Sequence, residues 1–340
     1  MQYSIANTDR KMKEFRISNN DQNQRLDKFL HKLLPNAQTS FIYKMLRKKN
    51  ITLNNKKANG KEKLSENDIV KIFFSDETFD KFSKDIEKAK KEYEYLASLK
   101  DSNIKVVYQD SDIIIINKPA NILSQKAKES DISANEYIIG YLIRSGELSF
   151  DDFLTFRPSI CNRIDRNTTG LLIAGKTLNG LQQMSESLKN RTIDKFYRCI
   201  VLGKVEKNLY LKGYLKKDRE DNTVEIIAED KYEKLKESNV KASKEYSLIE
   251  TSFEVVQSND RYTMLEVHLI TGKTHQIRAH LSHIGHPIIG DMKYGNSNAN
   301  EFAYKKYKVK HQLLHAYCLD LKGKNKVYAP VPAVFDKLMQ

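Results

Sequence analysis

The stretch CNRIDRNTTGLLIAGKT, residues 161–177, joins a charged turn to an apolar run and sets the interpretation of the chain around it. Its last eight residues match the G-x-x-x-x-G-K-[ST] pattern of nucleotide-binding P-loops. A P-loop is an exposed, glycine-rich turn that aims backbone N–H groups at phosphates. Here the four variable positions, 171–174, are Leu, Leu, Ile and Ala, which are typical of a buried strand. We predict a core strand with a turn at 175–177, and a nucleotide hydrolase that depends on Lys176 is the weaker alternative.

The turn before this strand places one carboxylate, Asp165, between Arg163 and Arg166. Two nearby cations would keep such a carboxylate available as an anion. Asp, Asn and Thr are also common turn residues, and Arg–Asp pairs at a surface are often inert. Composition alone therefore favours a structural turn over a catalytic carboxylate.

The composition indicates a folded protein with a polyanionic partner. The 340 residues are 40% hydrophobic, and the formal net charge is +14. Lys and Arg gain affinity for nucleic acids by releasing counterions from phosphates, so RNA or DNA is the leading partner class. No apolar run is long enough to span a membrane and the first 30 residues are polar, so we expect a cytoplasmic protein. Three scattered cysteines, Cys161, Cys199 and Cys318, are expected to be reduced and unpaired.

The positive charge is concentrated at the N-terminal end, where residues 1–60 hold 13 Lys and Arg against 4 Asp and Glu. A strand, FRI, is followed by an amphipathic helix within QRLDKFLHKLL, residues 24–34, that ends at Pro35. A second helix within TSFIYKMLRKKN, residues 39–50, has Thr39 or Ser40 as its expected N-cap. Its basic residues, expected on one exposed face that docks RNA, are Lys44, Arg47, Lys48 and Lys49. Two strands, ITLN and DIVKIFF, complete a small module at 15–75.

The rest of the chain predicts a charged linker and one larger domain. Residues 76–103 are dense in charge and contain no Gly or Pro, which indicates a linker that is partly helical. From residue 104 to 340, strand candidates outnumber helices and often follow one another directly. The strand candidates are IKVVYQ, DIIIIN, LLIAG, YRCIVLG, YSLIETSFEVV and YTMLEVHLI, and the main helices are LNGLQQMSESLKN and HQIRAHLSHIG. This mixture predicts an α+β domain on a mixed sheet.

A histidine-rich stretch, TGKTHQIRAHLSHIGHPIIGDMKYG, occupies residues 271–295. His280, His283 and His286 recur every three residues, which could suggest metal ligands. The third lies well off the helix face shared by the first two, and no Cys or acidic partner stands at ligand spacing. Packing and phosphate contacts explain these histidines better than a metal, and we predict no metal site.

Four segments carry a resemblance to a known family. NRIDRNTTGLLIAGKT, DKFYRCIVLG, LITGKTHQIRAHLSHIGHPIIGDMKYG and DSDIIIINKPAN resemble, in order, motifs of the RluA-type (RluC- or RluD-like) pseudouridine synthases. The basic N-terminal module resembles the ribosomal-S4-like RNA-binding domain found in many members. The resemblance implies a pseudouridine synthase fold with a mixed, largely antiparallel central sheet, plus a small S4-like α/β module. Departures from the family pattern are mild and comprise Asn162, Ile164, Thr169 and Lys273.

The resemblance also implies an activity and a site. Such enzymes break the C1′–N1 bond of a uridine in RNA, turn the base and rejoin it through C5, without a cofactor, metal or nucleotide. Asp165 would act at the sugar, either by attacking C1′ or by taking the 2′ proton, with Arg278 as its ion-pair partner. Tyr197 would stack on the flipped base with its hydroxyl near C5, and Arg163 would enter the space that the base leaves. The weaker phosphate contacts implied are Lys195, Lys273 and His275.

The substrate and the rival functions remain open in the sequence. The added N-terminal module favours large-subunit (23S) ribosomal RNA, with transfer RNA as the alternative, and we expect a monomer. A noncatalytic RNA-binding ribosome-assembly factor would use the same basic surfaces. An RNA methyltransferase would need a methyl-donor loop, and no glycine-rich loop follows the first strand of the large domain. Asp165, Tyr197 and Arg278 in family order favour the enzyme.

Overall fold

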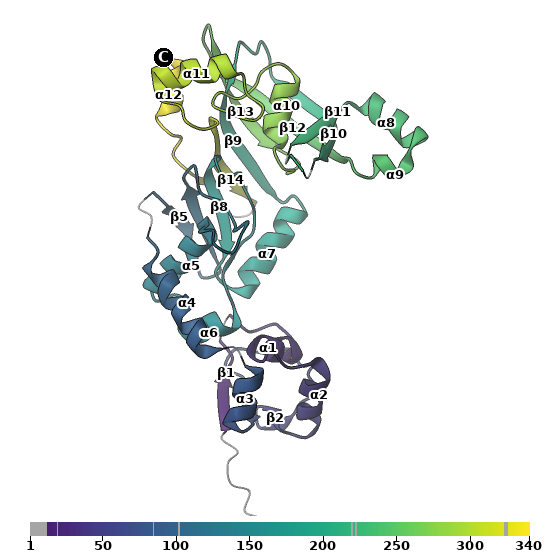
Figure 1. Cartoon of the computed structure of the whole chain (residues 1–340), viewed down its shortest axis with the longest axis vertical. Helices are drawn as coiled ribbons and strands as arrows, with labels where there is room; N and C mark the ends of the chain where they lie inside the picture. The colour runs from purple at the N-terminus through teal and green to yellow at the C-terminus, as the bar shows by residue number, and fades with distance from the viewer. Residues whose placement is uncertain are drawn as a thin grey trace, which may run out of the picture.

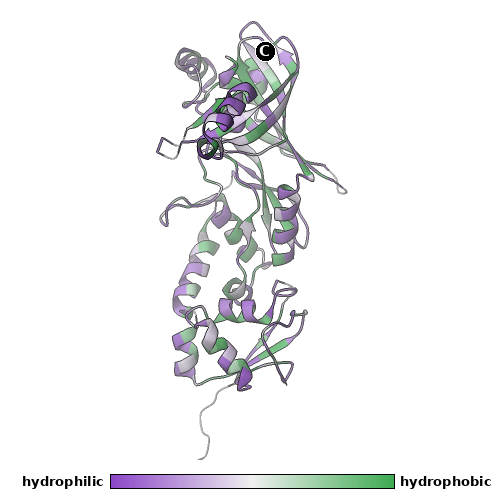
Figure 2. Cartoon of the chain, turned by 90° about the vertical axis from the view of Figure 1, so that its right-hand side faces the viewer, coloured by the Kyte–Doolittle hydropathy of each residue, from purple (hydrophilic) through white to green (hydrophobic). Residues whose placement is uncertain are grey.

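The structure is a computed structural model that describes residues 12–18, 20–83, 85–100, 103–218, 220–221, 223–322 and 326–340. An N-terminal module and a larger C-terminal domain follow one another along the long axis of the molecule (Figure 1). Among the described residues, no helix is long and apolar enough to cross a membrane. Hydrophobic residues recur along the strands, and the helices combine hydrophilic and hydrophobic residues (Figure 2).

The N-terminal module is a four-stranded antiparallel sheet covered by helices. Its strands lie in the order β1-β4-β2-β3. The apolar stripe of the first helix, including Leu26, Phe29 and Leu30, is buried against Val70 and Ile72 of the sheet. The predicted helices and strands of this module are confirmed. Its elements are β1 (Met12–Arg16), α1 (Leu26–Leu33), α2 (Thr39–Arg47), β2 (Ile51–Leu53), β3 (Lys56–Lys57) and β4 (Ile69–Phe73).

The N-cap of α2 differs from the prediction. Gln38 occupies that position and makes no side-chain capping bond. Thr39 is already helical, and its hydroxyl lies 3.3 Å from the His31 ring on α1. A contact between the two helices therefore takes the hydroxyl that we expected to cap α2.

The predicted basic face at the end of α2 is confirmed. Its four members, Lys44, Arg47, Lys48 and Lys49, are all exposed. Ile42 and Leu46 bury the opposite side of the helix. The helix itself ends at Arg47, so the last two lysines follow it.

The charged segment after the module is mostly helical. It contains α3 (Asp76–Phe82) and α4 (Ile86–Ser98). Phe79 of α3 packs into the N-terminal core, whereas Leu96 of α4 packs into the core of the larger domain. At the junction, the Thr155 hydroxyl donates a 2.6 Å hydrogen bond to the buried Asp21 carboxylate. The division of the chain at residues 75 and 103 stays a prediction.

The larger domain is built on one mixed, largely antiparallel sheet, as predicted. The strands run in the order β11-β10-β12-β13-β9-β14-β8-β6-β5, with β15 beside β14 and β7 beside β8. Among the described strands, only β8 and β14 pair in parallel. The strands are β5 (Lys105–Gln109), β6 (Ile113–Lys118), β7 (Ser159–Ile160), β8 (Thr169–Gly175), β9 (Ile193–Leu202), β10 (Leu209–Lys217), β11 (Val224–Ile227), β12 (Ser247–Ser258), β13 (Tyr262–Leu269), β14 (Leu314–Leu321) and β15 (Lys326–Tyr328).

Helices flank this sheet, and two of them were predicted. The helices after α4 are α5 (Ala134–Arg144), α6 (Phe150–Thr155), α7 (Leu178–Lys189), α8 (Glu229–Ser238), α9 (Val240–Ser243), α10 (Gln276–His283), α11 (Ser297–Tyr307) and α12 (Val334–Met339). The predicted α7 and α10 are confirmed, and so are all six predicted strands. The neighbouring helices α8 and α9 project from the edge of the sheet at β10 and β11 (Figure 1). All three cysteines are free.

The P-loop-like segment is a central strand, as predicted. Residues 171–174 of β8 are fully buried between β6 and β14. Lys176 is bound to the Glu147 carboxylate and to the Asp110 carbonyl oxygen, and Thr177 caps α7. At Gly170, φ is +109°, and a Cβ would lie 2.2 Å from the Ala316 carbonyl oxygen. Strand packing therefore accounts for this segment, and its lysine faces a carboxylate.

Candidate active site

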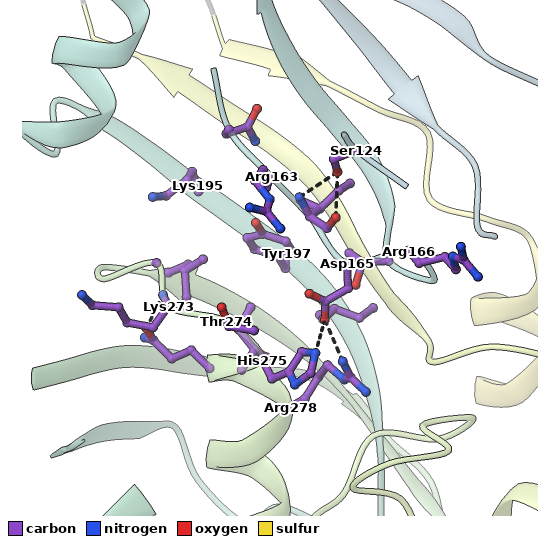
Figure 3. Close-up of a pocket in the computed structure, with 18 of the residues that line it drawn as sticks. Ser124, Arg163, Asp165, Arg166, Lys195, Tyr197, Lys273, Thr274, His275 and Arg278 are labelled. Carbon is purple, nitrogen blue, oxygen red and sulfur yellow. Dashed lines mark hydrogen bonds and ion pairs between the residues drawn. The ribbon is translucent and has the colours of Figure 1, made fainter. Parts of the chain in front are cut away.

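A cavity of about 1030 Å³ opens on the larger domain beside the charged turn that precedes β8. Its wall includes the loop after β6, the turn 161–168, residues of β9 and the segment from the end of β13 into α10, together with residues from the ends of α7 and β10 and from 292–293 and 312–314. This volume suits a ligand of nucleotide size or larger. The site residues predicted in the larger domain, Arg163, Asp165, Lys195, Tyr197, Lys273, His275 and Arg278, all line this one cavity (Figure 3).

The turn that carries Asp165 is held by two buried side chains, Lys118 at the end of β6 and Ser124 in the loop that follows. The Lys118 ammonium donates to the carbonyl oxygens of Pro119, Ile122 and Arg166 at 2.8–3.0 Å. The Ser124 hydroxyl donates to the Ile164 carbonyl oxygen at 2.7 Å and accepts from the Ile164 amide at 3.1 Å. Burial lowers the pKa of Lys118 to about 7, and Asp165 opposes that shift. These contacts fix the backbone on both sides of Asp165.

Arg278 joins Asp165 to a second, fully buried carboxylate. Its Nη1 donates to Oδ2 of Asp165 at 2.8 Å. Its Nε and Nη2 form a two-bond pair with Asp291 at 2.7 and 2.9 Å. The backbone amides of Lys293 and Tyr294 also donate to Asp291. One guanidinium thus bridges two carboxylates, and its orientation is set by the buried one.

The charges of this network shift the pKa values of Arg278 and Asp291. Burial alone would lower the pKa of Arg278, but Asp291 and Asp165 raise it above its ordinary value. Burial alone would raise the pKa of Asp291, but hydrogen bonds from Arg278 and two amides lower it below 3.8. The Arg278 side chain is 8% exposed and that of Asp291 is 0% exposed. Both groups are therefore held charged inside the protein.

The cation that pairs with Asp165 is not one of its neighbours in sequence. We expected Arg163 and Arg166 to supply the nearby positive charge, but the cation that pairs with Asp165 within the described residues is Arg278, with the His275 ring beside the carboxylate. In the view of Figure 3, Arg166 points away from the carboxylate, and Arg163 is drawn on the same side of the turn as Tyr197. In a turn, successive side chains diverge, so adjacency in sequence did not produce contact.

His275 lies at the Asp165 carboxylate instead of an open phosphate-binding surface. Its Nε2 is 3.9 Å from Oδ2 of Asp165, and its Nδ1 is 3.0 Å from the Tyr294 hydroxyl. The imidazole is 9% exposed, and burial lowers its pKa, with Asp165 opposing. Its backbone φ of +56° turns the chain into α10. His275 lines the cavity from this enclosed position, and its contact with a phosphate stays a prediction.

Tyr197 presents its phenol to the cavity from the middle of β9. The residue is 6% exposed, and its hydroxyl has no hydrogen-bond partner among the described residues. Burial raises the pKa of Tyr197, and Asp165 adds to the shift. The phenol is therefore protonated at neutral pH, and an incoming ligand can meet its free hydroxyl.

Three of the cations predicted to contact RNA, Arg163, Lys195 and Lys273, line the cavity without a carboxylate partner among the described residues. Arg163 and Lys273 are exposed, and Lys195 is partly buried. Burial lowers the pKa of Lys195, and Arg191 adds to the shift. These side chains can meet an anionic ligand. The basic face of α2 lies in the N-terminal module, outside the cavity.

Sequence reasoning missed the groups that support the carboxylate. Asp291 and Tyr294 stood in the quoted I-G-H-P-I-I-G-D-M-K-Y-G run, and Lys118 in the N-K-P turn. Their presence in family-like motifs was the only available signal. Nothing in the local sequence shows that Asp291 meets Arg278 or that Lys118 reaches the carbonyl group of Arg166.

The three histidines at 280, 283 and 286 do not converge. His280 is buried with its Nδ1 3.0 Å from the Thr251 hydroxyl, and burial lowers its pKa to about 4. His286 Nδ1 lies 3.0 Å from the Leu202 carbonyl oxygen. Among the described residues, no group of three or more His, Cys, Asp or Glu side chains could hold a metal ion.

The arrangement can bind a nucleotide and act on its sugar. An oriented carboxylate faces an open cavity beside a buried aromatic ring, with unpaired cations around it. A carboxylate in such a place can serve as a nucleophile or as a base. The ring offers a face for a base to stack on.

Comparisons with known proteins identify the family of the chain. Residues 112–283 match the model of the RNA pseudouridylate synthase family, and residues 24–70 match that of the S4 domain. An RNA pseudouridine synthase of Mycoplasma genitalium is 30% identical over 305 residues, covering 89% of this chain and 87% of the relative. The ribosomal large subunit pseudouridine synthase C of Buchnera aphidicola is 29% identical over 317 residues, covering 92% and 91%.

Solved structures support the fold. The human RNA pseudouridylate synthase domain containing 1 has a TM-score of 0.52 at 18% identity, covering 69% of this chain and 90% of that one. The human domain containing 4 has the same TM-score and identity, covering 74% and 95%. The predicted pseudouridine synthase fold and S4-like module are thus confirmed. The chain belongs to the RNA pseudouridylate synthase family and is an RNA pseudouridine synthase with an N-terminal S4 domain.

Proposed function

We propose that the enzyme isomerises specific uridines in large-subunit ribosomal RNA, with Asp165 acting at the sugar of a uridine flipped into the cavity. The observation that carries this proposal is the Arg278 bridge, which aims Asp165 at the cavity from the buried anchor Asp291. A carboxylate held in one orientation loses little entropy when it meets a substrate atom.

Asp165 acts during cleavage of the C1′–N1 bond. It either attacks C1′ and holds the sugar covalently until C5 displaces it, or removes the 2′ proton, which creates a C1′–C2′ double bond that takes the proton back when C5 attaches. The bonding electrons leave with N1 of uracil. On either route, the later bond forms between C1′ and C5, and the C5 proton is lost. Arg278 is a positioning residue here, because it acts through Asp165.

Tyr197 receives the flipped base. Its ring offers a stacking surface, and its partnerless hydroxyl lies in the cavity, where C5 would approach. Because the phenol is protonated, it can accept the C5 proton only while passing its own proton to water. Its expected contribution is therefore to the last step and to base stacking.

The unpaired cations account for RNA binding. Arg163 is exposed at the cavity that Tyr197 also lines, so it can occupy the gap left in the RNA stack. Lys195 and Lys273 are suited to the phosphates beside the target nucleotide. The basic face of α2 adds contacts to RNA outside the cavity.

The ribosomal substrate is supported by relatives and by the S4 domain. Relatives from Buchnera aphidicola and Vibrio parahaemolyticus are named ribosomal large subunit pseudouridine synthase C. The chain covers 91% and 77% of their lengths, so the likeness includes both domains. We propose that the enzyme is a cytoplasmic monomer and needs no cofactor.

Tritium release from RNA labelled at uridine C5 tests this proposal. We expect release from a large-subunit ribosomal transcript with wild-type enzyme and with Asp230→Asn, which alters an exposed carboxylate on α8. Asp165→Asn should lower release at least about a thousandfold, because it keeps the shape and removes the reactive charge.

Two outcomes of this experiment would contradict the proposed function. Release from transfer RNA alone would replace the ribosomal substrate. Normal release by a folded Asp165→Asn variant would remove Asp165 from the chemistry. If the variant lost release but kept a cellular role, a noncatalytic ribosome-assembly function would have to be added.

A further inference from the structure

The C-terminal end of α11 carries a concentration of positive charge that the active site does not use. Residues 302–310 contain four lysines and no acidic residue. We define the α11 patch as Tyr304, Lys305, Lys306, Lys308 and Lys310, all of which are exposed. Ala303 and Val309 are buried and hold the opposite side of this segment in place. The exposed face is therefore presented by a rigid support.

Positive charge and aromatic rings alternate on this patch. The Lys308 ammonium lies 5.9 Å from the centre of the Tyr304 ring, and that of Lys306 lies 5.0 Å from the Tyr307 ring. Tyr304 itself is 51% exposed. Lys305 pairs with Glu301, and within the described residues the other three lysines have no carboxylate partner. Free cations beside exposed rings are suited to phosphates and bases.

Helix stability does not account for this composition. Lysines near the end of a helix interact favourably with its dipole. Lys310, however, lies beyond the helix, and Lys308 has φ +59°, in the left-handed region. Glycine would take that position at lower cost. At the other end of the molecule, the basic helix α2 is followed by Lys49 with φ +58° in the same way.

The helix that carries the α11 patch contacts the segment that contains Asp291. The Asn300 side chain of α11 accepts from the Gly290 amide at 2.7 Å and donates to the Asp291 carbonyl oxygen at 2.9 Å. Asp291 orients Arg278. Two residues after Lys310, Gln312 lines the cavity. The helix that carries the patch therefore contacts the segment of Asp291, and the chain that follows the patch reaches the cavity wall at Gln312.

We infer that the α11 patch binds the backbone of the substrate RNA where it leaves the cavity on the side away from the S4 domain. Figure 1 places α2 and α11 at opposite ends of the long axis. RNA bound at both ends would be positioned across the enzyme, and phosphate contacts do this without reading sequence. This inference rests on the proposed RNA substrate and adds a second docking surface to it.

The test replaces Lys306, Lys308 and Lys310 by glutamine and compares the variant with Lys88→Gln, Lys90→Gln, Lys91→Gln. The control removes the same charge from three exposed lysines of α4. On a long large-subunit ribosomal fragment, we expect the patch variant to bind about tenfold more weakly at 0.1 M salt. The slope of log affinity against log salt should fall by about 2, as three lost single-strand phosphate contacts require. Turnover of a short stem-loop that fits the cavity should be unchanged.

Lys308→Gly separates RNA binding from helix stability. We expect an unchanged or higher melting temperature together with weaker binding of the long fragment. A lower melting temperature with unchanged RNA affinity would assign Lys308 to the helix end and overturn the inference. So would equal loss of affinity in the patch and control triples, since net charge alone would then explain it.

The RNA-binding test does not depend on whether the enzyme isomerises uridine in the RNA that is used. If wild-type enzyme released no tritium from ribosomal or transfer RNA, the proposed substrate would fail, but the salt slopes would still decide whether the patch binds RNA. If the patch variant lost binding to vesicles containing phosphatidylserine and kept its RNA affinity, the partner would be a membrane surface.

Discussion

The basic face of α2 and the network around Asp165 use charge in opposite ways. Lys44, Arg47 and their two neighbours are exposed and have no carboxylate partner among the described residues. Arg278, by contrast, is 8% exposed and contacts two carboxylates. Exposed charges act at long range and nearly independently, whereas buried charges must be paired and act as a unit. Substitutions in the Asp165 network should therefore have large effects on stability and turnover, whereas substitutions on α2 should have small effects on RNA affinity.

The largest effect is expected from Arg278→Met. Its removal leaves Asp291 buried without its partner and Asp165 without its support. We expect a loss of about 3–5 kcal/mol in the free energy of unfolding and little remaining turnover. Urea unfolding and tritium release would measure both. Arg198→Met, which breaks a more exposed pair with Glu266, is the matched control and should cost only about 1 kcal/mol. Equal losses of unfolding free energy in the two variants would mean that the burial of the Arg278 pair does not add to its effect on stability.

Tyr197→Phe should affect the reaction and leave the fold intact. It keeps the stacking surface and removes only the hydroxyl, so RNA affinity should be retained. We expect the single-turnover rate of C5 proton release to fall by about 10²–10⁴-fold. The control Tyr262→Phe removes a buried hydroxyl outside the cavity and should leave the rate unchanged. An unaffected rate in Tyr197→Phe would limit this residue to stacking.

Asp291→Asn should show how pH acts on the network. The folded-state pKa of Asp291 is lowered, so its stabilisation is complete above its ordinary value of 3.8 and is lost as pH falls through the lower folded value. At pH 7 the variant should be less stable by about 1.5–3 kcal/mol. The two proteins should converge in stability as pH falls below 3.8 and passes the lower folded-state pKa, as measured by urea unfolding. A difference that stayed constant down to that pH would show that charge is not its source.

The smallest effect is expected on α2. Lys44→Gln together with Arg47→Gln should weaken RNA binding a few-fold and lower the salt slope by about 1 per residue. The free energy of unfolding should change by less than about 0.5 kcal/mol, because neither side chain is buried. Filter binding at several salt concentrations, with Lys88→Gln and Lys90→Gln as the control, would measure this. A large loss of stability would mean that these exposed charges are coupled to the fold.

Much of the architecture could be predicted because it depends on short-range patterns. The apolar run 171–174 indicated a core strand, and the stripe through Leu26 and Phe29 indicated a helix. Both patterns, a short continuous apolar run and an apolar stripe at helical spacing, can be recognised from residues that are close in sequence. The strand β14 and the helix α11 were not predicted, although β14 pairs with both β8 and β9. The order of strands in a sheet depends on the whole sheet, so no local sequence pattern predicts which strands become neighbours.

The sequence by itself determined the family, the position of the carboxylate and the exposed basic face of α2. These follow from ordered motifs and from local composition. Only the tertiary structure decided which cation meets Asp165. Arg163 and Arg166 are two and one residues away from it in sequence, yet Arg278, 113 residues away, makes the contact. Side-chain direction in a turn and the register of a large sheet set such contacts, and both are properties of the folded chain.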